Sequence, residues 1–173
     1  MRNIFLCLML FISPTLFAKD YKKCLENTTW IVPPSTLLAY EYINGTSTAV
    51  EDQTVWTITK YEEGYFFGTA YTDVNDAPSS QKNLVGSITP SGDVYITFYP
   101  VGSTGDYVNG IGKFVKKDKK HYFVMQMNSA QNNFTGLTHW SYMISVKPGD
   151  PFYRHLPGVG ISVPDFISQF DNK

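Results

Sequence analysis

The chain has 173 residues, of which 14 are Lys or Arg and 15 are Asp or Glu, so its formal net charge is -1. This balance leaves no excess of basic side chains for nucleic acid and no polybasic segment for anionic lipid, and we predict neither partner. The length is sufficient for one domain with a hydrophobic core. Aromatic residues make up 16% of the chain and can supply much of the apolar area of that core.

Residues 1–18 (MRNIFLCLMLFISPTLFA) have the pattern of a secretory signal peptide. Arg2 precedes an uncharged apolar run, and small Ala18 stands at the expected cleavage site. The apolar run is shorter than the roughly 20 residues that a membrane span needs. We therefore predict export to a secreted or periplasmic location, with residues 19–173 as a single mature domain and no membrane span. Cleavage would leave Cys24 as the only cysteine, which would be free, modified or paired between chains.

The middle of the chain alternates apolar and polar residues in short segments that turn residues separate. Residues 83–100 (NLVGSITPSGDVYITFYP) show this pattern on both sides of a Pro-Ser-Gly-Asp turn, which predicts a β-hairpin. Such a meander can close on itself and so leave no exposed edge. We therefore predict an all-β fold, a single up-and-down antiparallel barrel of about eight strands. The expected strands are residues 28–32, 37–43, 54–61, 65–72, 84–89, 94–99, 108–115, 121–128 and 135–146, and residues 73–82 are expected to form an exposed loop beside a binding mouth.

The pattern changes in the last part of the chain, residues 147–173. The stretch PGDPFYRHLPG is rich in proline and glycine and cannot be a central strand. We predict an irregular tail that lies across the outside or the end of the barrel and covers an edge. Ser162, Pro164 and Asp165 match a helix-capping pattern, which predicts a short C-terminal helix.

Two segments resemble the calycin group of secreted barrels, which includes avidins and lipocalins. Residues 64–71 (GYFFGTAY) read glycine, aromatic, glycine, tyrosine after a threonine-rich strand, and residues 138–140 place a tryptophan in the last strand. The chain differs from both types, because Thr28 stands where lipocalins have the glycine of Gly-X-Trp and the biotin-binding residues of avidins have no counterparts. The resemblance implies a closed barrel and no site residue.

Large side chains occur on both faces of several predicted strands. This surplus must contact a ligand in the lumen, a partner or second copy on the outside, or the C-terminal tail. We predict a secreted, non-catalytic binding protein that carries a small apolar ligand in the barrel. The alternative is a protein–protein interaction module or effector that uses an exposed aromatic strand face, including a homo-oligomer. The candidate ligand contacts are Tyr95, Tyr99, Met125, Met127 and Trp140.

The structure can distinguish these hypotheses. A lumen filled by Trp56, Phe66 and Ile96 would exclude the ligand carrier. A strictly monomeric protein with a charged exterior would count against the interaction module.

An enzyme is the third hypothesis, and the sequence favours it least. It requires His139 or His155 to lie in a cleft with a carboxylate within hydrogen-bonding reach. The chain has no Gly-X-Ser-X-Gly motif, and its three histidines lack metal-ligand spacing, so we predict no catalytic residue, no metal and no cofactor. Because neighbouring residues on a strand face opposite sides, His139 points outward if Trp140 is in the core, and we expect that arrangement.

Overall fold

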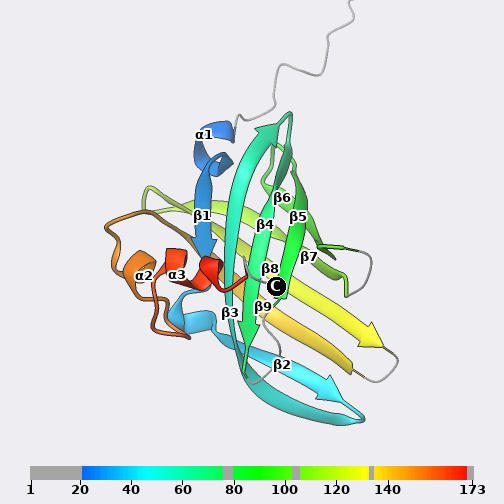
Figure 1. Cartoon of the computed structure of the whole chain (residues 1–173). Helices are drawn as coiled ribbons and strands as arrows, with labels where there is room; N and C mark the ends of the chain where they lie inside the picture. The colour runs from blue at the N-terminus through cyan, green and yellow to red at the C-terminus, as the bar shows by residue number, and fades with distance from the viewer. Residues whose placement is uncertain (1–20, 76–79, 103–105, 133–134, 171–173) are drawn as a thin grey trace, which may run out of the picture.

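The computed structural model describes residues 21–75, 80–102, 106–132 and 135–170 (Figure 1). The expected signal peptide, residues 1–18, lies outside the described residues. Antiparallel strands form a closed barrel, which confirms the predicted fold class. The strands are β1 (Thr28–Ile31), β2 (Leu38–Ile43), β3 (Thr46–Glu62), β4 (Tyr65–Val74), β5 (Ser80–Ile88), β6 (Asp93–Pro100), β7 (Val108–Lys117), β8 (Lys120–Asn132) and β9 (Thr135–Val146). The helices are α1 (Lys22–Leu25), the 3-10 turn η2 (Pro34–Thr36), α2 (Pro151–Arg154) and α3 (Val163–Ser168).

The nine described strands occupy eight positions around the barrel, because β1 and β2 follow one another in a single position. Both pair with β3 on one side and with β9 on the other. Through β1, Val55 of β3 lies level with Ile144 of β9, and through β2, Ala49 lies level with Thr138. The numerical offset between the two strands is the same in both cases. The turn η2 therefore interrupts this position of the wall without shifting the register.

Several of the predicted strand boundaries were wrong. β3 begins at Thr46, eight residues before the expected strand, because its first half is polar and carries no apolar alternation. The expected loop at residues 73–82 is shorter, since β4 continues to Val74 and β5 begins at Ser80. Residues 76–79 between them lie outside the described part of the chain.

Aromatic side chains fill the half of the lumen nearest α1. The ring of Phe123 lies at the centre, with ring centroids of Trp30 and Phe114 at 4.8 Å. Trp56 and Phe66 contact the same ring at 5.5 and 5.8 Å. All five of these side chains are buried, and Leu25 of α1 closes this end of the barrel.

Glycine makes room for one of these large rings. A Cβ atom at Gly86 of β5 would lie 2.1 Å from Cζ of Phe66, closer than atoms can approach. The glycine of β5 and the phenylalanine of β4 are direct cross-strand partners. This half of the lumen is therefore filled to the point where one methyl group has no room.

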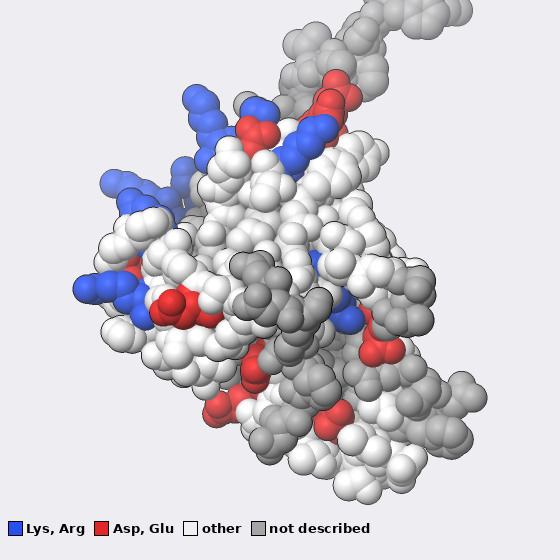
Figure 2. Space-filling model, in the orientation of Figure 1, with Lys and Arg blue, Asp and Glu red and all other residues white. Residues whose placement is uncertain are grey.

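The C-terminal tail packs on the outside of the barrel. Leu156, Val163 and Phe166 of the tail cover Ile31 of β1 and Val55 of β3 in a second apolar cluster. The tail was expected to cover an edge, but β1 is paired on both sides, so the tail covers an outer face instead. On the face of the molecule that Figure 2 shows, most basic side chains lie near α1 and the tail. The surface over the strands on this face is largely uncharged.

The short helix α3 begins as the capping pattern predicts. Ser162 accepts a hydrogen bond from the backbone N–H of Asp165 at 3.2 Å, and its hydroxyl donates to the carboxylate of Asp165 at 2.6 Å. Pro164 lies in the first turn, where a missing N–H costs nothing. This helix then directs Phe166 onto the barrel.

Candidate functional site

The half of the barrel away from α1 contains a cavity of about 720 Å³. Volumes of 300 to 1,000 Å³ are typical of sites for small molecules. Trp56, Phe98 and Met143 form its apolar inner end, where the filled half of the lumen begins. Ile43 of β2 and Val74 of β4 line its outer part, near the strand ends at the lower side of Figure 1.

A group of polar side chains lies inside this cavity at the level of the interruption between β1 and β2. Asp52 and Thr54 extend from β3, and His139 and Ser141 extend from β9. These residues lie on the parts of β3 and β9 that come after the pairing with β2 ends and before the pairing with β1 begins. At this level no complete strand lies between β3 and β9. The side chains of the two strands reach across this gap and meet each other.

The central contact is a buried pair formed by Asp52 and His139, which are 5% and 4% exposed. Oδ2 of Asp52 and Nδ1 of His139 are 3.0 Å apart. The other ring nitrogen, Nε2, donates to the backbone carbonyl of Thr36 in η2 at 2.6 Å. The histidine therefore links β3, β9 and η2 and satisfies one backbone carbonyl at the interruption.

The surrounding hydroxyl groups have fixed proton directions. Thr54 donates its only hydroxyl proton to Oδ1 of Asp52 at 2.6 Å. The hydroxyl of Thr72 on β4 lies 2.9 Å from that of Thr54, so Thr72 must be the donor in this contact. Thr72 also lines the cavity and, having used its proton, offers only acceptor capacity there.

The protonation of His139 follows from its two contacts. Burial of the ring lowers its pKa, but the hydrogen bond to Asp52, the negative charge of Asp52 and the bond to Thr36 raise it and outweigh the burial. The pKa of His139 is therefore above the ordinary value of 6.5. Both ring nitrogens face oxygen acceptors, so the doubly protonated imidazolium is the form of His139 that satisfies both contacts.

Ser141 differs from its neighbours because its hydroxyl has no partner within the described part of the chain. The residue is 4% exposed and lines the cavity. By the offset between β3 and β9 described above, it lies level with Asp52. Buried hydroxyl groups in native proteins are usually hydrogen bonded, and an unpaired one costs about 1 to 3 kcal/mol.

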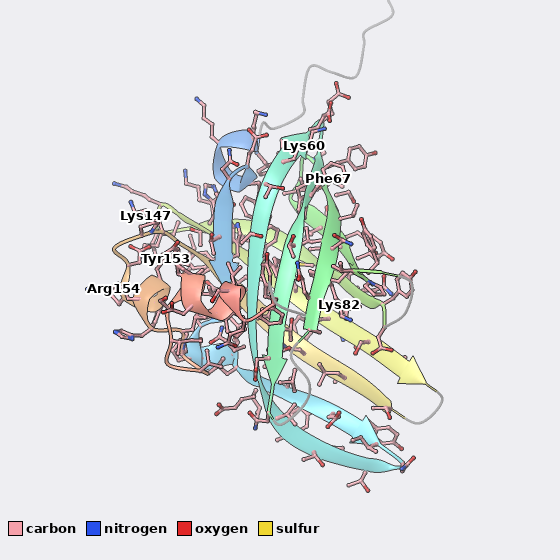
Figure 3. All side chains as sticks on the ribbon, in the orientation of Figure 1. Lys60, Phe67, Lys82, Lys147, Tyr153 and Arg154 are labelled. Atoms are coloured by element: carbon pink, nitrogen blue, oxygen red, sulfur yellow. The ribbon has the colours of Figure 1, made fainter. Side chains whose placement is uncertain are left out.

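Lys82 of β5 lies in the outer part of the cavity wall (Figure 3). Its ammonium group donates to the backbone carbonyl of Asp106 at 3.0 Å. Partial burial lowers the pKa of Lys82, and the charge of Asp106 opposes this shift. A cationic group is therefore held near the mouth, at a different level from the buried pair.

The five predicted ligand contacts do not come together. Met127 lines the cavity, and Met125 is buried beneath it in the core. Tyr95, Tyr99 and Trp140 lie on the outer wall and are 54%, 38% and 65% exposed. One cavity ligand cannot contact all five side chains, so the prediction divides into an inner and an outer group.

The expected orientation of β9 was wrong. Trp140 points outward and His139 inward, the reverse of the expectation. The apolar residues that suggested an inner face, Ile144 and Val146, pack under the C-terminal tail. A covered outer face and a polar lumen together produce this inverted pattern.

Five residues that line the cavity were not predicted from the sequence: Asp52, Thr54, Thr72, Lys82 and Ser141. Asp52 and Thr54 alternate with the inward Trp56 on the same strand, a signal that could have placed them inside. Ser141 alternates in the same way with buried Met143. Nothing local indicates that Asp52 meets His139, because 87 positions separate them.

The tests proposed for the competing functions give mixed results. Trp56, Phe66 and Ile96 do fill one half of the lumen, yet the cavity lies beyond them. His139 does meet a carboxylate in a cavity, as an enzyme would require. However, its second nitrogen is bonded to the carbonyl of Thr36, so the ring has no nitrogen available to a substrate.

Comparisons with protein-family models, with curated proteins and with solved structures found no match for this chain. Across the described residues no helix is long and apolar enough to cross a membrane. The same residues contain no group of three or more His, Cys, Asp or Glu side chains placed to hold a metal ion.

Proposed function

We propose that this protein is a non-catalytic binding protein that holds a small, largely apolar molecule in the open half of a calycin-like barrel. The signal-peptide pattern of residues 1–18 supports a secreted or periplasmic setting for this role. The observation that carries the proposal is the cavity of about 720 Å³, whose inner end is apolar and whose middle is polar. Sites for small molecules combine an apolar lining with a few placed polar groups in this way.

The wall of the cavity also supports binding without catalysis. A rigid closed barrel preorganises its lining, so little conformational freedom is lost when a ligand enters. Asp52 and His139 fix the interrupted part of the wall and satisfy each other. Their role in the proposal is to hold the cavity open.

The proposal can be tested with the apolar fluorescent probe N-phenyl-1-naphthylamine. Leu137 of β9 lines the cavity, and Leu137→Trp would fill part of it. Leu38 of β2 is 54% exposed, and Leu38→Trp is the matched control with the same change of side chain. We expect the Kd of the probe to rise about tenfold or more in Leu137→Trp, a loss of roughly 1.4 kcal/mol, and to stay unchanged in Leu38→Trp.

Absence of probe binding by the wild type would overturn the proposal, as would equal binding by both variants. Native mass spectrometry of the exported protein provides an independent measurement. We expect it to show a bound small molecule that Leu137→Trp loses.

A second candidate function rests on a row of exposed apolar residues across the outer wall. Tyr95 of β6 pairs with Ile111 of β7, and these are 54% and 57% exposed. Ile111 pairs with Gln126 of β8, which in turn pairs with Trp140 of β9. The tail does not cover this row, so it could contact another protein or a second copy.

Sedimentation of the purified protein tests the second candidate. If the row joins two copies, the wild type forms a dimer and Trp140→Glu is a monomer. Phe152→Glu changes an apolar residue of α2 that is 37% exposed, and it should leave the dimer intact. A wild type that is monomeric at high concentration would exclude self-association through this row.

A further inference from the structure

We infer that the ligand carries an uncharged group that both donates and accepts hydrogen bonds, a hydroxyl or an amide, and that this group binds Ser141 in the middle of the cavity. The inference rests on the proposed function and specifies the ligand class for the same site. Its main observation is the hydroxyl of Ser141, which is 4% exposed and has no partner among the described residues.

No group in the described part of the protein forms a hydrogen bond with the hydroxyl of Ser141. Asp52 lies level with Ser141 by the offset between β3 and β9, but its carboxylate accepts from Thr54 and His139 and makes no hydrogen bond with the hydroxyl of Ser141. Main-chain groups of the adjacent strands are used by the β8–β9 ladder, where Ser141 pairs with Met125. A ligand in the cavity that accepts from Ser141 would remove the cost of the unpaired hydroxyl.

The hydrogen-bonding groups and charges of the other cavity residues determine which charge the ligand's polar group can carry. Thr72 has used its proton on Thr54 and presents only lone pairs to the cavity. Asp52 carries a negative charge that its pairing with His139 neutralises. A carboxylate or phosphate placed beside Ser141 would meet acceptors and a second carboxylate, with one hydroxyl proton to share.

A cationic group is disfavoured at the same place. It would lie beside the imidazolium of His139, which already neutralises Asp52. A hydroxyl or amide can accept from Ser141 and donate to Thr72 or to a remaining lone pair of Asp52. Its apolar body would then lie against Trp56 and Met143, which line the inner end of the cavity.

Lys82 offers the competing arrangement. An anionic ligand could place its carboxylate on this ammonium group near the mouth and leave Ser141 unpaired. The two arrangements predict opposite preferences among ligands of the same length, which makes them separable by experiment.

The test uses four probes that share a ten-carbon chain and differ in the polar end: decanol, decanamide, decyl methyl ether and decanoate. Each is titrated in competition with N-phenyl-1-naphthylamine at pH 7. We expect decanol and decanamide to bind the wild type about five- to tenfold more tightly than the ether, which corresponds to one net hydrogen bond, and decanoate to bind most weakly.

Two alanine variants locate the polar group. Ser141→Ala should weaken decanol, decanamide and the ether by about five- to tenfold, because each of them accepts a hydrogen bond from Ser141 in the wild type. Ser145→Ala is the matched control, because Ser145 lies on the same strand, is exposed and does not line the cavity. It should leave all four affinities unchanged.

Thermal unfolding without ligand separates binding from a structural role for Ser141. Removing an unpaired hydroxyl should leave the Tm of Ser141→Ala equal to or above that of the wild type. A clear loss of Tm would show that the hydroxyl has a partner in the folded protein and would overturn the inference.

The outcomes also distinguish this inference from the proposed function. If none of the probes binds, including the ether and the fluorescent probe, the proposed function fails. If all four bind alike, or if decanoate binds most tightly and Lys82→Met abolishes that preference, the function stands and the inference fails. The inference fails as well if Ser141→Ala leaves the affinity for decanol unchanged.

Discussion

The buried pair formed by Asp52 and His139 should be among the most important polar contacts for stability. In Asp52→Ala, the imidazolium of His139 and the hydroxyl of Thr54 both lose their acceptor in a site that is almost closed to water. Removing one member of a buried ion pair costs about 3 to 5 kcal/mol, because the remaining charge stays buried without compensation. We expect a loss of this size in the free energy of unfolding at pH 6.

The pH dependence of that loss has a definite sign. The folded-state pKa of His139 lies above its ordinary value, so its pairing stabilises the protein fully below about pH 6.5. This contribution is lost as the pH rises through the raised folded-state pKa. The difference between wild type and His139→Ala should therefore be larger at pH 6 than at pH 9.

Urea unfolding followed by tryptophan fluorescence measures these free energies. The two single variants and the double variant form a cycle, and we expect a coupling energy of roughly 1 to 3 kcal/mol between the two residues. Glu62→Ala removes the carboxylate of an exposed pair with Lys60 and should have little effect on the free energy of unfolding. The reasoning is refuted if Asp52→Ala costs no more than this control, or if the single effects add without coupling.

Three further predictions concern other parts of the barrel. Phe123→Ala, at the centre of the aromatic cluster, should cost about 3 to 5 kcal/mol in urea unfolding, and a loss below 1 kcal/mol would contradict the filled half of the lumen. Gly86→Ala should cost about 1 to 3 kcal/mol because its Cβ would strike the ring of Phe66, and an unchanged unfolding curve would contradict that contact. The hydrogen bond from Lys113, with those from two neighbouring hydroxyls, lowers the pKa of Asp93 to about 2, so its contribution to stability is present above pH 3.8 and falls as the pH drops toward 2. Titration by NMR should show this low pKa in the wild type and a higher one in Lys113→Ala.

The hairpin of β5 and β6 was predictable because all of its determinants are local. Its strands alternate strictly, and the turn residues between them include Gly92, whose φ of 86° suits glycine. Val94, Ile96 and Phe98 point into the lumen as the alternation indicates. When one face of a strand packs only in the core and the other contacts only solvent, the alternation of apolar and polar residues identifies the inner face.

In strand β9 the alternation of apolar and polar residues does not identify the inner face. Its alternation correctly separates two faces but cannot say which face is inside, because both are half apolar. Ile144 and Val146 are apolar on the outside since the tail covers them, and His139 and Ser141 are polar on the inside since the lumen is hollow there. Both causes lie far away in the sequence, so neither is visible in the strand itself.

The hollow half of the barrel and the interruption of its wall have a common physical cause. Where η2 replaces a strand, β3 and β9 lose ladder partners, and the backbone of η2 needs other ones. His139 donates to the carbonyl of Thr36 in η2 from inside the lumen, and Gln53 donates to the carbonyl of Val32, just before η2, from outside. Polar side chains are therefore required inside the barrel at this level. Apolar residues packed against them would keep water or a ligand from reaching Asp52 and Ser141. If the protein binds a ligand here as proposed, that ligand would add RT ln(1 + [L]/Kd) to the stability of the folded barrel.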